Sequence, residues 1–153
     1  METDESFKHF IAGFVSGEGS FFVSLQRNSA YKVNTQVVCG FSIKVRADDR
    51  ELIDLIWQAF DFAGNVHEVS AERYRYEYDA GIHRNDAVMY IVRKRSDLLE
   101  RIIPFFDTYS LHGRKRENYE LWKQVVYMVE QGAHLTPEGL AEIVEIKAQM
   151  NRY

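Results

Sequence analysis

The chain has 153 residues, a formal net charge of −4 and one cysteine, and 46% of its residues are hydrophobic. This composition is typical of one packed globular domain, here expected over residues 1–153, and it excludes a disordered or fibrous chain. It also excludes a membrane span, which needs roughly 18 consecutive apolar residues, and an intrachain disulfide or cysteine-rich zinc site. The acidic start of the chain lacks the features of a signal or transit peptide. We therefore expect a soluble, intracellular protein, located in the cytoplasm or nucleoid or in an organelle matrix, with no membrane partner.

A helix followed by two strands is predicted at the start of the chain. Apolar residues recur at helical spacing over residues 7–16, and the Gly17-Glu18-Gly19 sequence then ends the helix. Residues 20–28 and 35–46 alternate between apolar and polar side chains, which is the period of strands. The loop between these strands is short enough for them to pair as a hairpin.

The rest of the chain is predicted to repeat the helix and strand pair and to end in helices. Asp48 and Glu51 resemble a capping box that begins a helix ending near Gly64. The later segments are strand-like at 65–79 and 86–94 and helical at 97–106, at 117–131 and after Thr136. The order α-β-β-α-β-β-α, with extra C-terminal helices, predicts an α+β fold. Because the sequence has no internal repeat, any second copy of a motif must come from another chain.

The charges are unevenly distributed, which answers the objection that an acidic protein binds nucleic acid poorly. Four cations and no acids lie between residues 20 and 46, whereas acids collect in the predicted helices. The outward side chains of the strands are of the kinds that read base edges: Ser24, Gln26, Asn28, Gln36, Ser42, Lys44 and Arg46, with Arg73 and Arg75 on the third strand. For any one of these residues, an ordinary solvated sheet face is as good an explanation as contact with DNA. Taken together, the residues favour contact with DNA. Residues 93–95 are interpreted as a solvated strand end.

The first helix carries small residues and ends at an acid. Ala12 and Gly13 would permit close approach of another helix, and Glu18 lies at the negative end of the helix dipole, where a carboxylate is disfavoured. If this helix packs against its own copy about a two-fold axis, the two carboxylates meet and need a divalent cation. Hard oxygen ligands favour Mg²⁺. A plain turn with tight intrachain packing explains the same spacing.

The segment Ile11-Ala-Gly-Phe-Val-Ser-Gly-Glu-Gly-Ser-Phe21 resembles the signature of the LAGLIDADG homing endonuclease family. Similarity continues in the same order through residues 41–52, 109–123 and 134–151, so it covers nearly the whole chain. The resemblance implies the fold of that family, with an antiparallel DNA-binding sheet. It also implies a homodimer that hydrolyses both strands of a long, near-palindromic DNA site with divalent metal, and an interface formed by Phe10, Ala12, Gly13 and Phe14.

The resemblance also assigns the catalytic groups. It implies that Glu18 is the catalytic carboxylate and a ligand of Mg²⁺, with the carbonyl of Gly17 as a further metal ligand. Arg114 or Lys115 is the basic residue expected near the scissile phosphate. Ser16 stands in place of the first acid of the motif, a position that does not bind the metal.

Two other functions remain open for this fold. One is an RNA-binding intron maturase, which needs a basic surface suited to RNA shape. The other is a non-catalytic DNA-binding module. The intact Glu18 argues against both.

Overall fold

The structure is a computed structural model that describes residues 2–70 and 86–151. Its elements are α1 (Glu5–Glu18), β1 (Gly19–Arg27), β2 (Thr35–Arg46), η1 (Ala47–Asp49), α2 (Arg50–Ala59), β3 (Asn65–Val69), β4 (Ala87–Val92), α4 (Arg95–Asp97), the π-helical segment η3 (Leu98–Ile102), α5 (Ile103–Thr108), α6 (Arg114–Glu130), η4 (Ala133–Leu135) and α7 (Pro137–Gln149). The predicted α+β class and element order are confirmed.

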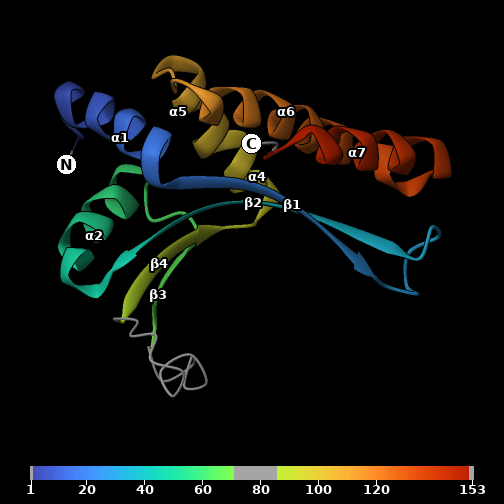
Figure 1. Cartoon of the computed structure of the whole chain (residues 1–153), viewed down its shortest axis with the longest axis horizontal. Coiled ribbons are helices and arrows are strands. Elements are labelled where there is room, and N and C mark those ends of the chain that lie inside the picture. The colour runs from blue at the N-terminus through green and yellow to red at the C-terminus, as the bar shows by residue number, and fades with distance from the viewer. Residues whose placement is uncertain (1, 71–85, 152–153) are drawn as a thin grey trace.

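The four strands form one antiparallel sheet in the order β1-β2-β4-β3. Figure 1 shows a curved sheet with α1, α5, α6 and α7 on its convex side. Among the described residues, no helix covers the concave side. The molecule is therefore a two-layer structure with one face of its sheet open, as antiparallel sheets permit.

The alternation predicted for the first two strands is present. Phe21 and Val23 of β1 and Phe41 and Ile43 of β2 are buried, and Phe21 pairs directly with Phe41. Since side chains alternate across a strand, the residues between them face the concave side. The hydrophobic side of the hairpin thus faces the helices.

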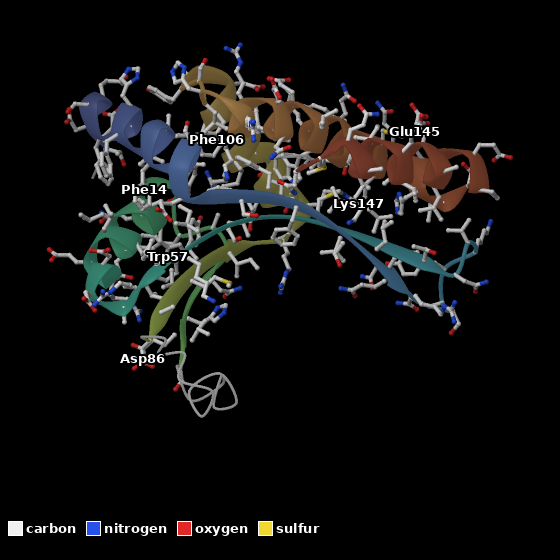
Figure 2. The ribbon with its side chains drawn as sticks, viewed as in Figure 1. Phe14, Trp57, Asp86, Phe106, Glu145 and Lys147 are labelled. Carbon is white, nitrogen blue, oxygen red and sulfur yellow. The ribbon has the colours of Figure 1, made fainter. Side chains whose placement is uncertain are left out.

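An aromatic cluster joins the sheet to the helices. The ring of Phe21 lies 5.2 Å from that of Phe41 and 5.6 Å from that of Phe106, between centroids. It also lies 5.2 Å from Tyr119 and 5.0 Å from Trp122, both on α6. Phe106 lies between the helices and the sheet (Figure 2). These contacts fix α5 and α6 over the start of β1.

Several predicted boundaries differ from the structure. The capping box is wrong: Asp48 lies in η1 and pairs with Arg46 at 2.9 Å, and no side chain caps α2. Helix α6 begins at Arg114, three residues before the start at residue 117 that the sequence predicted. Thr136 does cap α7, because its Oγ1 accepts a hydrogen bond from the Gly139 N–H at 3.1 Å. None of the helices in the described parts of the chain has the length and hydropathy needed to cross a bilayer.

We predict that Phe21→Ala lowers the free energy of unfolding by about 3–5 kcal/mol, because it leaves a cavity among four aromatic rings. Urea denaturation measures this loss. Val144→Ala is the control, since Val144 is 45% exposed and should change stability by less than about 0.5 kcal/mol. Equal losses in the two variants would contradict the placement of Phe21 in the core.

Candidate functional site

Glu18 lies where α1 passes into β1 without a loop. It is the last residue of the helix, and Gly19 is the first residue of the strand. A Cβ at position 19 would lie 2.5 Å from Cγ1 of Val15 and 2.9 Å from its carbonyl oxygen. Only glycine permits this direct passage, which holds the exposed Glu18 at the edge of the sheet.

The segment before α6 and the first turn of that helix contact the same junction. The ammonium group of Lys115 donates a hydrogen bond to the carbonyl oxygen of Gly19. The Ser16 hydroxyl donates to the carbonyl of Ala12 at 2.8 Å and accepts from the His112 N–H at 3.1 Å. These bonds bring a cation beside the residue that follows Glu18.

Of the two basic residues predicted near the site, Lys115 contacts the junction through its hydrogen bond to the Gly19 carbonyl. Arg114 is exposed at the first position of α6, which begins after Gly113 with φ 68°. Both therefore lie at one helix end, and Lys115 is the one directed at Gly19.

The other end of α1 is anchored to the chain segment that precedes α6. The Tyr109 hydroxyl donates to the carboxylate of Glu5 at 2.9 Å, and the ammonium group of Lys8 donates to it at 3.0 Å. The hydrogen bond from Lys8, followed by that from Tyr109, lowers the pKa of Glu5. The helix is thus tied at both ends to residues 109–115.

The end of α1 offers oxygen donors suited to a hard cation. Besides the carboxylate of Glu18 there are main-chain carbonyls at the helix end, which includes Gly17, since the last carbonyls of a helix lack intrahelical partners. The space that a side chain at Gly17 would enter holds no atom within 4 Å. In the described part of the chain no three His, Cys, Asp or Glu side chains form a metal-binding group.

The outward side of α1 is apolar. The rings of Phe7, Phe10 and Phe14 stack in a row, with both neighbouring centroid distances at 5.7 Å. Phe10 is 46% exposed, and nothing lies within 4 Å of the place where a Cβ of Gly13 would be. This stripe is unusual for a surface helix, because it exposes aromatic groups and bare backbone together.

One residue predicted for this surface lies elsewhere. Ala12 is only 4% exposed and faces inward together with Ile11 and Val15. Its side chain cannot contact a partner, so its assignment to an interface is corrected to the core of the chain. The reason is helical geometry, because residue 12 follows residue 11 by about 100° and stays on the buried side.

The concave side of the sheet carries the polar residues predicted to read DNA. Side chains from β1 and β2 on this side are Ser24, Gln26, Gln36, Ser42, Lys44 and Arg46, and Gln26 pairs directly with Gln36. The Asn28 amide beyond β1 donates to Oε1 of Gln36 at 3.4 Å. Arg73 and Arg75 lie outside the described residues. The six strand residues share one face, as the alternation predicted.

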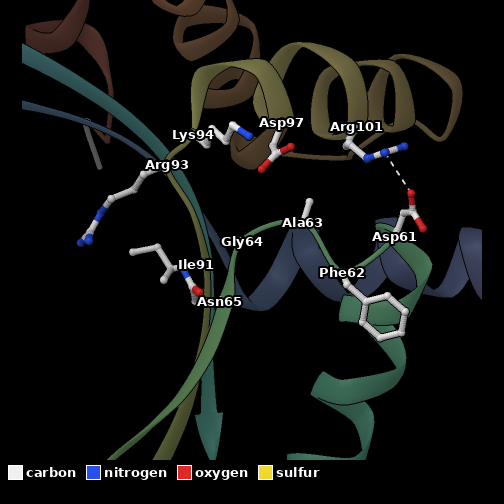
Figure 3. A pocket seen from close by; sticks show the side chains of 10 residues that line it. All are labelled: Asp61, Phe62, Ala63, Gly64, Asn65, Ile91, Arg93, Lys94, Asp97 and Arg101. Carbon is white, nitrogen blue, oxygen red and sulfur yellow. Dashed lines mark ion pairs between the residues drawn. The ribbon is translucent and has the colours of Figure 1, made fainter.

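Arg93 is a further basic residue of the concave face. The sequence had suggested only a solvated strand end at residues 93–95. Phe41 pairs with Val92, so Arg93 leaves the sheet opposite Gly40 and continues the alternation of Met89 and Ile91. Figure 3 shows Arg93 directed away from Lys94 and Asp97, at the rim of a hollow of about 430 Å³. The period of two in residues 87–93 was the signal that identifies it.

Comparison with known proteins identifies the family. The model of the LAGLIDADG endonuclease family matches residues 11–126. The chain belongs to the LAGLIDADG endonuclease family. A Neurospora crassa protein named as a probable intron-encoded endonuclease is 34% identical over 142 residues, which make up 93% of this chain but 28% of that protein. The chain therefore spans little more than a quarter of that relative.

Solved LAGLIDADG structures share the fold. The meganuclease I-SmaMI, bound to an uncleavable DNA, superposes with a TM-score of 0.83 at 32% identity, over 95% of this chain and 45% of that one. The homing endonuclease I-TnaI superposes with a TM-score of 0.81 at 29% identity, over 99% of this chain and 90% of that one. The resemblance seen in the sequence is confirmed, and the LAGLIDADG motif is α1 with its exit into β1.

We predict that Ser16→Ala accelerates hydrogen exchange of the His112 amide and lowers the free energy of unfolding by about 0.5–1.5 kcal/mol, since one hydrogen bond to that N–H is lost. Thr108→Ala is the matched control, because the Thr108 hydroxyl donates to the Pro104 carbonyl at 2.9 Å, four residues back, as Ser16 does to Ala12. Unchanged exchange at His112 in Ser16→Ala would show that the hydroxyl does not hold the two segments together.

Proposed function

We propose that this chain acts as a homodimeric, divalent-metal-dependent homing endonuclease that hydrolyses both strands of a specific DNA duplex. The observation that carries the proposal is the placement of the exposed Glu18 carboxylate beside the Lys115–Gly19 contact, at the edge of an open sheet face. The family supports it, as do the names of relatives, which include endonucleases and the homing endonuclease I-LtrWI bound to target DNA.

The homodimer is proposed because the sequence contains one motif, with no internal repeat to supply a second. This chain aligns with less than half of I-SmaMI but with nearly all of I-TnaI. The LAGLIDADG fold of one chain thus corresponds to half of the larger enzyme, and a second copy would supply the other half. The open positions Gly13 and Gly17 lie four residues apart beside Phe10 and Phe14, which allows two α1 helices to approach closely.

The catalytic cation is proposed to be Mg²⁺, held by the carboxylate of Glu18 and the carbonyl of Gly17, because both are hard oxygen donors. I-SmaMI has been observed on uncleaved target DNA in the presence of calcium ions. When bound, such a cation stabilises the negative charge of the attacking and leaving oxygens of a phosphodiester. Lys115 adds a positive charge next to the same site, where it attracts the scissile phosphate.

Target recognition is assigned to the concave face. Its residues donate and accept hydrogen bonds at base edges, and the cations Lys44, Arg46 and Arg93 attract the phosphates that flank them. All the helices in the described residues lie outside this face, so a duplex can reach it. Strands β1 and β2 contain no acid, and among their cations Arg46 pairs with Asp48 at 2.9 Å.

We predict that Glu18→Gln slows strand cleavage by about 10²–10³-fold or more while leaving folding and DNA binding intact, because the amide keeps the size of the side chain but loses the charge that holds the cation. The assay follows nicking and binding in parallel with Mg²⁺, on a duplex selected from a randomised palindromic library. Glu145→Gln is the control, since Glu145 lies exposed on α7 (Figure 2).

Other results would identify a different function. Equal cutting by wild type and Glu18→Gln would remove Glu18 from the mechanism. Tight DNA binding without cutting by either protein would favour the non-catalytic module. Preference for structured RNA over duplex DNA would favour the maturase.

A further inference from the structure

An apolar group lies on the concave face at the β1 edge of the sheet, among the polar residues assigned to base recognition. Phe22 is half-buried and lies on the same side of β1 as Ser20 and Ser24, opposite the buried Phe21 and Val23. Its partner in the antiparallel register is Gly40 of β2. A large aromatic ring therefore stands next to a position with no side chain.

The ring of Phe22 uses the space that Gly40 leaves empty. A Cβ at Gly40 would lie 2.2 Å from Cζ of Phe22 and 2.7 Å from each Cε. Gly40 has no positive φ that would require glycine, and glycine within a strand is unfavourable. Because Gly40 has no side chain, the ring of Phe22 can lie flat across β2 instead of pointing away from the sheet.

Other apolar side chains share this face. Val38 pairs with Ser24, one step along the same two strands, while Ile91 and Met89 of β4 pair with Ser42 and Lys44. An exposed antiparallel sheet face is ordinarily polar. In the described parts of the chain the helices lie on the other side of the sheet, and at the β1 edge Phe22 also lines an open hollow with Val144, Lys147 and Ala148 of α7. The flat ring of Phe22, with Val38 beside it, is thus available to a ligand bound on the concave face.

The bases of duplex DNA offer one apolar group in the major groove, the 5-methyl of thymine. We propose that the Phe22–Gly40 pair, with Val38 beside it, forms a contact site for that methyl group and thereby fixes one thymine in each half of the target. This inference rests on the proposed function. It adds an apolar specificity determinant to the polar and basic residues of the face, none of which distinguishes thymine from uracil by hydrogen bonding, since the two bases differ only in the methyl.

The test replaces each thymine of the selected duplex in turn by deoxyuridine, which removes only the methyl group. We expect wild-type protein to lose about three- to fivefold in affinity at one position of each half-site, the loss that burial of one methyl group predicts. Phe22→Ser should show no such loss at that position. Phe22→Leu should keep most of it, because leucine retains an apolar surface there.

A second variant tests the role of the glycine. Gly40→Ala should displace the ring and abolish the methyl effect at the same position, while the fold is retained because the end of a side chain can move away. Gln26→Ala is the control, since it removes a polar group of the same face but leaves Phe22 in place. Thermal unfolding checks that all variants are folded.

Equal affinity of wild type for thymine and deoxyuridine at every position would overturn the inference. So would an unchanged methyl effect in Phe22→Ser, or a selected target with no thymine at which the methyl matters. If wild type selects no duplex at all, the proposed function itself fails. That result is distinct from sequence-specific binding without methyl dependence, which leaves the proposed function intact and removes only the role of Phe22.

Discussion

Gly19 packs so tightly against Val15 that no side chain fits between the motif helix and the first strand. Because α1 ends and β1 begins without a loop, the position of Glu18 is set by two rigid elements at once. Helix α1 exposes its apolar stripe, and β1 is an edge strand of the sheet. The proposed dimer contact, metal ligand and DNA-binding face therefore meet at a single junction, where rigid elements place groups more accurately than loops do.

The segment that precedes α6 stabilises this junction from the other layer. Ser16 accepts a hydrogen bond from the main chain of His112, and Lys115 donates to Gly19, so the basic end of α6 and the acidic end of α1 are held together. A carboxylate at a helix C-terminus is electrostatically unfavourable by itself. In the proposed enzyme a bound cation would balance the negative charges of Glu18 and of the substrate phosphate at this helix end.

The accuracy of each prediction from the sequence depended on the periodicity of the residue pattern on which it rested. Alternation in β1 and β2 was sufficient to put Ser24, Lys44 and their neighbours on one face, because a period of two leaves no ambiguity. Ala12 was misplaced since it lies at the border of the buried side of a helix. The sequence did not show whether Arg114 or Lys115 is directed at Gly19. Successive helical residues point about 100° apart, and the packing of α6 on α1 determines which of them faces the junction. Arg93 was missed where a strand ends, and the pairing of Phe22 with Gly40 requires the register of the hairpin.

The most direct test of the account uses mixed dimers that contain one wild-type chain and one Glu18→Gln chain, purified through two different affinity tags. Under the proposed function each chain contributes one Glu18 to a shared site, so mixed dimers should bind the selected duplex as wild type does and fail to make double-strand breaks. Wild-type rates of double-strand cleavage by the mixed dimer, or full activity of a chain that sediments as a monomer on DNA, would contradict it.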